Sequence, residues 1–409
     1  MKKTLLISLA LLARLSLAQD APPVQAITLE EALRTAQANR PTIEAARLRV
    51  ESARRGRSAL VAPLPLRLDL QATSNRELYG NDDDIAISQA IDLFGRRRAN
   101  RSLGDAQILL AQATLRGTLA EVQADVVDRY AEAVAANQLV QTGAAQLQLA
   151  ERLLEATRQR AEGGVIAPVQ VKRVGIEVER ARQSLALRQS AAVAARRRLA
   201  GALGVLPDTV AVADFPSIPV APVDAATLAL QRSDLLQISA QAAIAQANVG
   251  VTRLQFRPDF EVSARTSPYS YGPNGPSGFR ATLSIPIFDY GRTRSEVRAG
   301  EASAQAERRT LADASARAQA ELEAVNVELA AANEQRQGFE RLLADSRELV
   351  RVSEVGFREG ATTLLEVLEA NRSLREVEET LVESRLRVAQ AQATYLRTTG
   401  TLLLGGNPS

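Results

Sequence analysis

The stretch that decides the fold of this chain occurs twice. Residues 87–98 have the sequence ISQAIDLFGRRR, and residues 283–294, 196 positions further on, have the sequence LSIPIFDYGRTR. Upstream, Pro65–Leu68 resembles Pro258–Glu261 at an offset of 193. We therefore predict two structural repeats, the second of which carries three extra residues between its strands.

The repeats divide the chain into predicted domains. Residues Glu162–Val165 resemble Arg358–Ala361, again 196 positions apart, so the repeat continues far beyond the first motif. Four prolines between Pro207 and Pro222 predict an extended connection between the two copies. The predicted boundaries are a first repeat at 19–204, a linker at 205–223, a second repeat at 224–404 and a tail at 405–409.

Each repeat contains a predicted β-hairpin, at residues 66–92 and 260–288. Leu66, Leu68 and Leu70 alternate with polar neighbours, which is the period of a strand with one apolar face. Strands of about eight to ten residues are long enough to cross a bilayer when tilted. Four strands cannot close around a lumen, so several chains would have to share one barrel. Two amphipathic hairpins that cover a soluble core would show the same alternation.

Long helical segments free of proline follow the hairpins. They run from Gly95 to about Ala161 and from Gly291 to about Val355, with apolar residues at coiled-coil spacing. Two shorter helices together match one long helix in length, so we predict antiparallel coiled coils. The fold class is mainly α with a membrane β-barrel; a solid soluble bundle is the alternative for the helices alone. The predicted short helices are 28–61, 168–203, 224–256 and 362–404, with helical turns near 163–168 and 357–362.

An export signal is predicted at positions 1–18. Lys2 and Lys3 precede a short apolar segment, and Ser16–Ala18 is a small-x-small cleavage site, so the mature chain would start at Gln19. A buried N-terminal helix is the alternative. The chain has 50 Lys and Arg against 47 Asp and Glu. Removing Lys2, Lys3 and Arg14 leaves 47 of each, so the charge balance does not indicate a nucleic-acid partner.

The composition excludes several kinds of chemistry. The chain has no His and no Cys, so it cannot build a zinc finger, a haem-ligating His, a Ser-His-Asp triad, a thiol nucleophile or a lipid-anchored N-terminal cysteine. No stretch approaches the roughly 18 uncharged apolar residues of a membrane-spanning helix. We therefore predict a protein that is not an enzyme and has no cofactor or bound metal.

The chain resembles the TolC family of outer-membrane efflux ducts over nearly all of residues 28–404. The resemblance rests on Gly360–Leu368 (GATTLLEVL), on its first-repeat counterpart Gly164–Val171 (GVIAPVQV) and on Ile285–Arg292 (IPIFDYGR). It implies a homotrimer with a 12-stranded barrel in the outer membrane and a helical tunnel that extends into the periplasm. It also implies a periplasmic adaptor as a partner, and an inner-membrane pump reached through that adaptor.

The resemblance also implies roles for particular residues. The helical turns would contact the adaptor, although a glycine there can equally be a plain helix C-cap. Glu366 and Glu369 would ring the periplasmic mouth and favour cations, unless they only form a solvated helix face. Arg385 would help to hold the mouth closed, and its partner in the first repeat would be the residue at position 170, which is Gln170 here. The adaptor-contacting residues would be Gly164, Val165, Ile166, Gly360, Ala361 and Thr362.

The sequence departs from the family pattern at two of these positions. Gln170 stands where the family has an acid, and Thr362 stands where an Arg is often found, so the ion-pair lock of the closed mouth is in doubt. Tyr269 and Tyr271 lie in the second hairpin tip, where aromatic side chains suit a membrane interface.

Three function classes follow from these features. A passive trimeric export channel is our leading hypothesis. The alternatives are a non-conducting periplasmic coiled-coil adaptor or scaffold, and an exported enzyme that would have only scattered carboxylates to use. The sequence does not identify the exported substrate.

Overall fold

A computed structural model describes residues 26–71, 84–206, 211–216, 218, 222–266 and 277–404. The predicted export signal and the tail at 405–409 lie outside these residues. The same holds for both hairpin tips, including Tyr269 and Tyr271, and for parts of the predicted linker.

The described residues are mainly helical, as predicted. Four long helices dominate: α4 (Arg96–Glu162), α5 (Pro168–Leu203), α8 (Arg292–Glu359) and α9 (Leu364–Thr399). The predicted end of α4 was within one residue, whereas α8 continues four residues beyond Val355. Its last turn continues because Phe357 is buried in an apolar cluster. None of the described helices has an apolar, weakly charged stretch long enough to cross a membrane.

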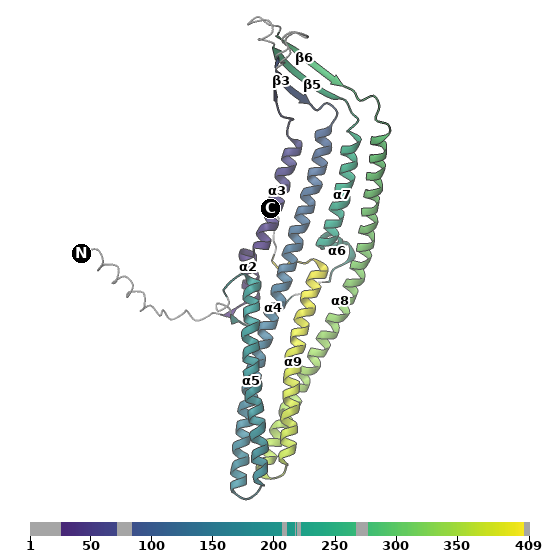
Figure 1. Cartoon of the computed structure of the whole chain (residues 1–409). Helices are drawn as coiled ribbons and strands as arrows, with labels where there is room; N and C mark the ends of the chain where they lie inside the picture. Colours follow the sequence, from purple (N-terminus) through teal and green to yellow (C-terminus); the bar gives the residue numbers. More distant parts are fainter. Residues whose placement is uncertain are drawn as a thin grey trace, which may run out of the picture. The chain divides into compact units, whose positions relative to one another are not determined.

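The four predicted strands form one antiparallel sheet in the order β2-β3-β5-β6. Figure 1 labels β3, β5 and β6 of this sheet. Their bounds are β2 (Arg67–Gln71), β3 (Asp84–Ile91), β5 (Asp259–Thr266) and β6 (Ser277–Ser284). Leu68 lies opposite Ile87 and Leu70 opposite Ile85, so the apolar side chains share one face. Strands β3 and β5 form a seam between the repeats. Strands β2 and β6 are the two edges, each paired on one side only within the described residues.

The strand register corrects the predicted spacing of the repeats. Arg67 pairs with Ser88, and Asp259 pairs with Ser284, which is the counterpart of Ser88 at the offset of 196. Asp259 is therefore the counterpart of Arg67, at an offset of 192 and not 193. An odd offset would exchange the two faces of the strand, because side chains alternate with a period of two. The second hairpin has four extra residues between these positions, where the sequence comparison had predicted three.

Two helices that were predicted to be continuous are broken. The first is divided into α2 (Leu29–Asn39) and α3 (Pro41–Val61), and the second into α6 (Ala225–Gln231) and α7 (Ser233–Arg253). Arg40 has ψ 113°, because the residue before a proline is disfavoured in the helical region. Arg232, its counterpart at the offset of 192, is also extended, although serine follows it. Its guanidinium contacts Asp234 at 2.8 Å and Glu321 at 2.6 Å.

A second, small sheet was not predicted. Strand β1 (Ala26–Ile27) pairs in parallel with β4 (Ala211–Val212), which lies in the segment predicted to be only an extended linker. The hydroxyl of the buried Tyr130 donates to the carbonyl of Ile27 at 2.9 Å and accepts from the amide of Ala213 at 3.3 Å. Burial raises the pKa of Tyr130. This side chain therefore ties both short strands to α4.

The chain divides into two compact units, neither of which is one repeat. The first unit comprises residues 1–39, 125–218 and 332–390, and the second comprises 40–124, 219–331 and 391–409. The first contains the helical turns and a core around Leu153, Val174 and Phe357. The second contains the four-stranded sheet and a core around Leu235, Leu322 and Tyr395.

Candidate functional site

Both helical turns of the first unit end on a glycine in the left-handed conformation. Gly164 has φ +72° and Gly360 has φ +85°, which only glycine adopts without strain. The amide of Val165 donates to the carbonyl of Arg160 at 2.9 Å, and that of Ala361 donates to Gly356 at 2.7 Å. Both glycines therefore act as helix C-caps. A Cβ atom at either glycine would meet no atom within 4 Å, so the surface around each turn is open.

The other residues of the turns differ in exposure. Val165 is exposed, Ala361 is exposed and Ile166 is half-buried. Thr362 folds back, because its hydroxyl donates to the carbonyl of Ser353 on α8 at 2.9 Å. The exposed surface of the second turn is therefore smaller than the sequence suggests, since Thr362 is committed to α8.

Glu366 belongs to a capping box at the start of α9. Its carboxylate accepts from the amide of Thr363 at 2.7 Å, and the hydroxyl of Thr363 accepts from the amide of Glu366 at 3.3 Å. Glu366 is exposed, as is Glu369 one turn later. The sequence analysis placed Glu366 either at a channel mouth or on a solvated helix face, but it missed that Glu366 caps the start of α9.

Glu369 lines a cavity of about 440 Å³ between α4, α5 and α9. Its apolar lining residues include Leu149, Leu153 and Leu368. Three arginines and two glutamates line it, so its charged groups sum to +1. The positive charge next to Glu369 weakens the negative potential that the sequence predicted for this region. The charged lining residues are Arg173, Arg372, Arg375, Glu177 and Glu369.

The structure gives Arg385 and Gln170 separate surroundings. Arg385 forms an ion pair with Glu340 of α8 at 3.4 Å, so it connects α9 to its own helical partner. The side-chain oxygen of Gln170 is buried and has no hydrogen-bond partner among the described residues. Within that part of the chain, no hydrogen bond or ion pair connects these two side chains.

Two other arginines connect helices of the first repeat to helices of the second. Arg160 of α4 donates a hydrogen bond to the carbonyl of Phe357 on α8 and lies over its ring. Arg188 of α5 forms an ion pair with Glu379 of α9 and also donates to the carbonyl of Leu139 at 3.2 Å. The sequence analysis missed both, because neither position has a similar residue at its counterpart in the other repeat.

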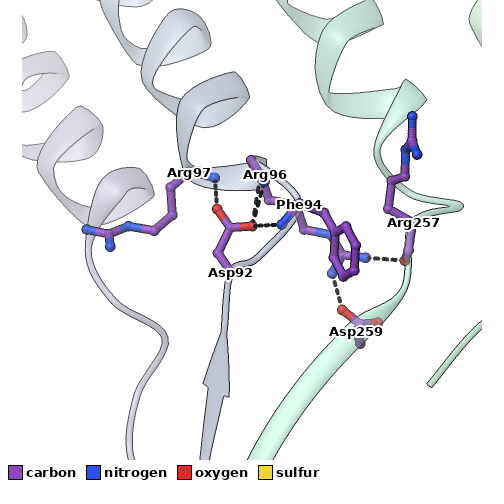
Figure 2. Close-up of polar contacts among 7 residues, drawn as sticks. Asp92, Phe94, Arg96, Arg97, Arg257 and Asp259 are labelled. Atoms are coloured by element: carbon purple, nitrogen blue, oxygen red, sulfur yellow. Dashed lines mark hydrogen bonds and ion pairs between the residues drawn. The ribbon is translucent and has the colours of Figure 1, made fainter. Parts of the chain in front are cut away.

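A second notable site lies where β3 joins α4 (Figure 2). The carboxylate of Asp92 accepts four backbone hydrogen bonds at 2.7–3.2 Å, from the amides of Phe94, Gly95, Arg96 and Arg97. Burial alone would raise the pKa of Asp92, but these four donors lower it on balance. Asp289, one position beyond the counterpart of Asp92, accepts in the second repeat from Gly291 at 3.0 Å and Thr293 at 2.9 Å. The strand-to-helix turn is therefore fixed in both repeats.

Arg96 connects this turn to the second repeat. Its guanidinium forms an ion pair with Asp259, at the start of β5, and donates to the carbonyl of Arg257 at 3.0 Å (Figure 2). The β3–β5 seam is therefore held by side chains at its helical end as well as by the strand ladder.

Comparison with known proteins finds one matching family model and several relatives that cover most of the chain. The family model described as outer membrane efflux protein matches residues 32–205 and 226–401. The cobalt-zinc-cadmium resistance protein CzcC of Cupriavidus metallidurans is 26% identical over 356 residues, which cover 85% of this chain and 84% of the relative. The pyoverdine export outer membrane protein OpmQ of Pseudomonas aeruginosa is 27% identical over 407 residues, which cover 91% and 85%.

A solved structure has a similar fold. The outer-membrane channel OprN superposes with a TM-score of 0.76 at 21% identity, covering 91% of this chain and 89% of that one.

Proposed function

We propose that this chain, which belongs to the outer membrane efflux protein family, forms the outer-membrane channel of an export pump. The channel lies in the cell outer membrane, extends into the periplasm and lets substrates pass without using energy itself. In this proposal the chain catalyses no reaction, needs no cofactor and has no nucleic-acid partner. Its partners are two further copies, outer-membrane lipid, a periplasmic adaptor and, through the adaptor, an inner-membrane pump.

The observation that carries this proposal is the four-stranded sheet with two open edges. One face of the sheet is apolar, and Leu68, Leu70 and Phe279 on it are largely exposed, which suits contact with lipid. The edge strands β2 and β6 leave backbone groups that another strand can pair. Three copies would supply 12 strands, enough to close a barrel, where four cannot.

The open turns support contact with an adaptor. Gly164 and Gly360 present backbone with free space around it, so another chain can approach closely. Val165 and Ala361 are exposed beside them, and Ile166 and Thr362 complete the two turns.

The charged residues near the turns support control of the mouth. Glu366 and Glu369 would each occur three times in a trimer and attract cations, against the opposing charge of nearby arginines. We assign the closing contacts to Arg160 with Phe357 and to Arg188 with Glu379, because these pairs connect helices of different repeats. Arg385 and Gln170 contribute less, since Arg385 is paired with Glu340.

The exported substrate is left open by the relatives. One is named for resistance to cobalt, zinc and cadmium, and another for export of pyoverdine. The two names point to different substrates, which fits a water-filled conduit whose selectivity lies mainly with the pump.

Planar-bilayer recording of the purified protein tests this function. The expected result is a trimer in detergent, by native mass spectrometry, that produces stable conductance steps. A trimer that never conducts would favour the scaffold, and a monomer that never inserts into a bilayer would exclude the channel.

A further inference from the structure

The pairing of β3 with β5 joins the two hairpins inside one chain. The equivalent pairing of β6 with a β2 strand would need a second copy of the chain. At the β3–β5 seam, the second strand of the first repeat's hairpin meets the first strand of the second repeat's hairpin. The equivalent partner for β6, the second strand of the second hairpin, would be a β2 strand, the first strand of a first hairpin. The chain's own β2 lies at the opposite edge of the sheet, so that partner has to come from a second copy.

We propose that the segment directly after β6 of one copy, Ile285–Ile287, extends that strand and pairs antiparallel with β2 of a second copy, with Ile287 opposite Leu68 and Ile285 opposite Leu70. This inference rests on the proposed channel and specifies how its copies join. The occupant of the open edge is thereby a second copy of this chain, in one defined register.

The register follows from the seam that the chain already contains. In that seam Ile91 lies opposite Phe260, and Gln89 lies opposite Val262. The offset of 196 leads from Ile91 and Gln89 to their counterparts Ile287 and Ile285. The offset of 192, applied backwards, leads from Phe260 and Val262 to Leu68 and Leu70. Both offsets come from the hairpin pairings, in which Arg67 corresponds to Asp259 and Ser88 to Ser284.

The faces of the strands agree with this register. Leu68 and Leu70 lie on the apolar face of the sheet, opposite Ile87 and Ile85. Leu283 lies opposite Phe260 on that same face. Ile285 and Ile287 follow the end of β6, and in a strand extended to them they would continue the alternation of Leu283. A register shifted by one residue would place the charged Arg67 or Asp69 opposite Ile287 or Ile285, so the apolar face would be interrupted.

Exposure identifies the uncovered segment. Gln89–Ile91 pairs with β5, and Ile91 is 41% exposed. Ile285–Ile287 has no strand partner among the described residues, and Ile287 is 90% exposed. The same position of the two repeats is therefore covered by strand pairing in one case and open in the other.

The register also brings together a pair of like charges. Within the chain, Arg96 forms an ion pair with Asp259. Their counterparts across the proposed interface are Arg292 of one copy and Arg67 of the next. Within one copy, Arg292 forms an ion pair with Glu296 of its own helix at 2.7 Å. Arg67 of the next copy carries the same charge as Arg292, so it cannot form an ion pair with it. The interface between copies therefore lacks the charge attraction that the seam inside the chain has.

Disulfide cross-linking tests the register, because the chain has no cysteine of its own. Directly opposed residues of an antiparallel pair have Cα atoms about 4.5–5.5 Å apart, within disulfide range. The test variant combines Ile287→Cys with Leu68→Cys. The matched controls combine Ile287→Cys with Arg67→Cys, on the opposite face, or with Leu70→Cys, shifted by two residues. All are oxidised in outer-membrane fractions and resolved on non-reducing gels.

We expect the test variant to form covalent dimers and trimers at a yield several times that of either control. If the protein is trimeric by native mass spectrometry and a control cross-links better, or no variant cross-links, the register is wrong while the channel stands. If the unsubstituted protein is monomeric and does not conduct, the proposed function itself fails.

A charge substitution provides a second test that needs no cysteine. Arg67→Asp recreates across the interface the pair that Arg96 and Asp259 make inside the chain. We expect the trimer of this variant to dissociate at a higher temperature than that of Arg67→Asn, with a smaller difference in about 1 M salt. Adding Arg292→Ala should remove the gain. An equal gain with and without Arg292 would overturn the proposed contact.

Discussion

The guanidinium of Arg160 lies 4.6 Å from the centre of the Phe357 ring, and the same side chain donates a hydrogen bond to the carbonyl of Phe357. Arg160 lies in the last turn of α4 and Phe357 in the last turn of α8, so one residue connects the ends of the two long helices. Phe357 itself is buried with Leu153, Val174 and Val367. The connection therefore combines a cation–π contact, a hydrogen bond and an apolar cluster.

We predict that Arg160→Ala raises the conductance of the channel. The substitution removes a cation–π contact and a charged hydrogen bond, together worth about 1–3 kcal/mol, so the two helix ends separate more easily. Single-channel recording measures the change. Arg158→Ala, two residues earlier and exposed, is the matched control. Equal conductance in both variants and the unsubstituted protein would contradict a closing role for Arg160.

Neutralising the two glutamates should reduce cation preference. Glu366→Gln with Glu369→Gln is the suitable variant, because a glutamine at 366 can preserve the capping box that alanine would break. We expect the reversal potential in a salt gradient to move toward that of a non-selective pore. The control is Glu334→Gln, an exposed residue of α8. An unchanged reversal potential in the double variant would remove these residues from the mouth.

Substitutions at the turn glycines should separate folding from adaptor contact. Asparagine tolerates the left-handed conformation, so Gly164→Asn and Gly360→Asn should fold while adding a side chain to the open surface. We expect pull-down of the adaptor to fall at least several-fold, with membrane insertion unchanged. Gly163→Asn, next to the turn but without a positive φ, is the control. Normal adaptor binding by both variants would leave the glycines with a capping role only.

Gly400 should be the glycine least tolerant of alanine. Its φ is +68°, and a Cβ atom there would lie 2.5 Å from the carbonyl oxygen of Gln231. We expect Gly400→Ala to lower the free energy of unfolding by at least about 2 kcal/mol, from backbone strain and overlap. Gly338→Ala, inside α8 with no atom within 4 Å, should raise it by about 0.5–1 kcal/mol. Thermal unfolding in detergent compares the two, and equal midpoints would contradict the close approach.

Acid should weaken the turn between β3 and α4. The pKa of Asp92 is lowered in the folded chain from its ordinary value of 3.8. Its contribution to stability is therefore present above about pH 3.8 and is lost as the pH falls through the folded pKa. We expect Asp92→Asn to flatten the fall in unfolding temperature between about pH 5 and 2. Asp345→Asn, exposed on α8, should leave that fall unchanged. The prediction fails if both variants behave alike.

The long helices could be predicted from sequence because their signals are local. Pro168 starts α5, glycines end the helices beside the turns, and apolar residues keep coiled-coil spacing between them. Pro41 is a local signal for the break after α2, which the prediction of one helix over 28–61 overlooked. The break at Arg232 has no such local signal, since it involves an ion pair with Glu321 of another helix.

The missed features depend on residues far apart in the chain. Strands β1 and β4 are two residues each, and they form because Tyr130 connects them, which no short sequence pattern reveals. The contact between Arg160 and Phe357 likewise joins different repeats. The offset of 193 was wrong because Pro65 and Pro258 align as letters while the strand faces require 192. Only the pairing of Arg67 with Ser88 and of Asp259 with Ser284 resolves this difference.

The seam between β3 and β5 sets an order of assembly. Both strands belong to one polypeptide, so they meet at the high effective concentration of a tethered pair, at a rate independent of how many copies are present. Arg96 and Asp259 hold this seam with opposite charges. The open edges have to find each other by diffusion. A newly made chain can therefore complete its own sheet first, and the supply of other copies limits only the later step.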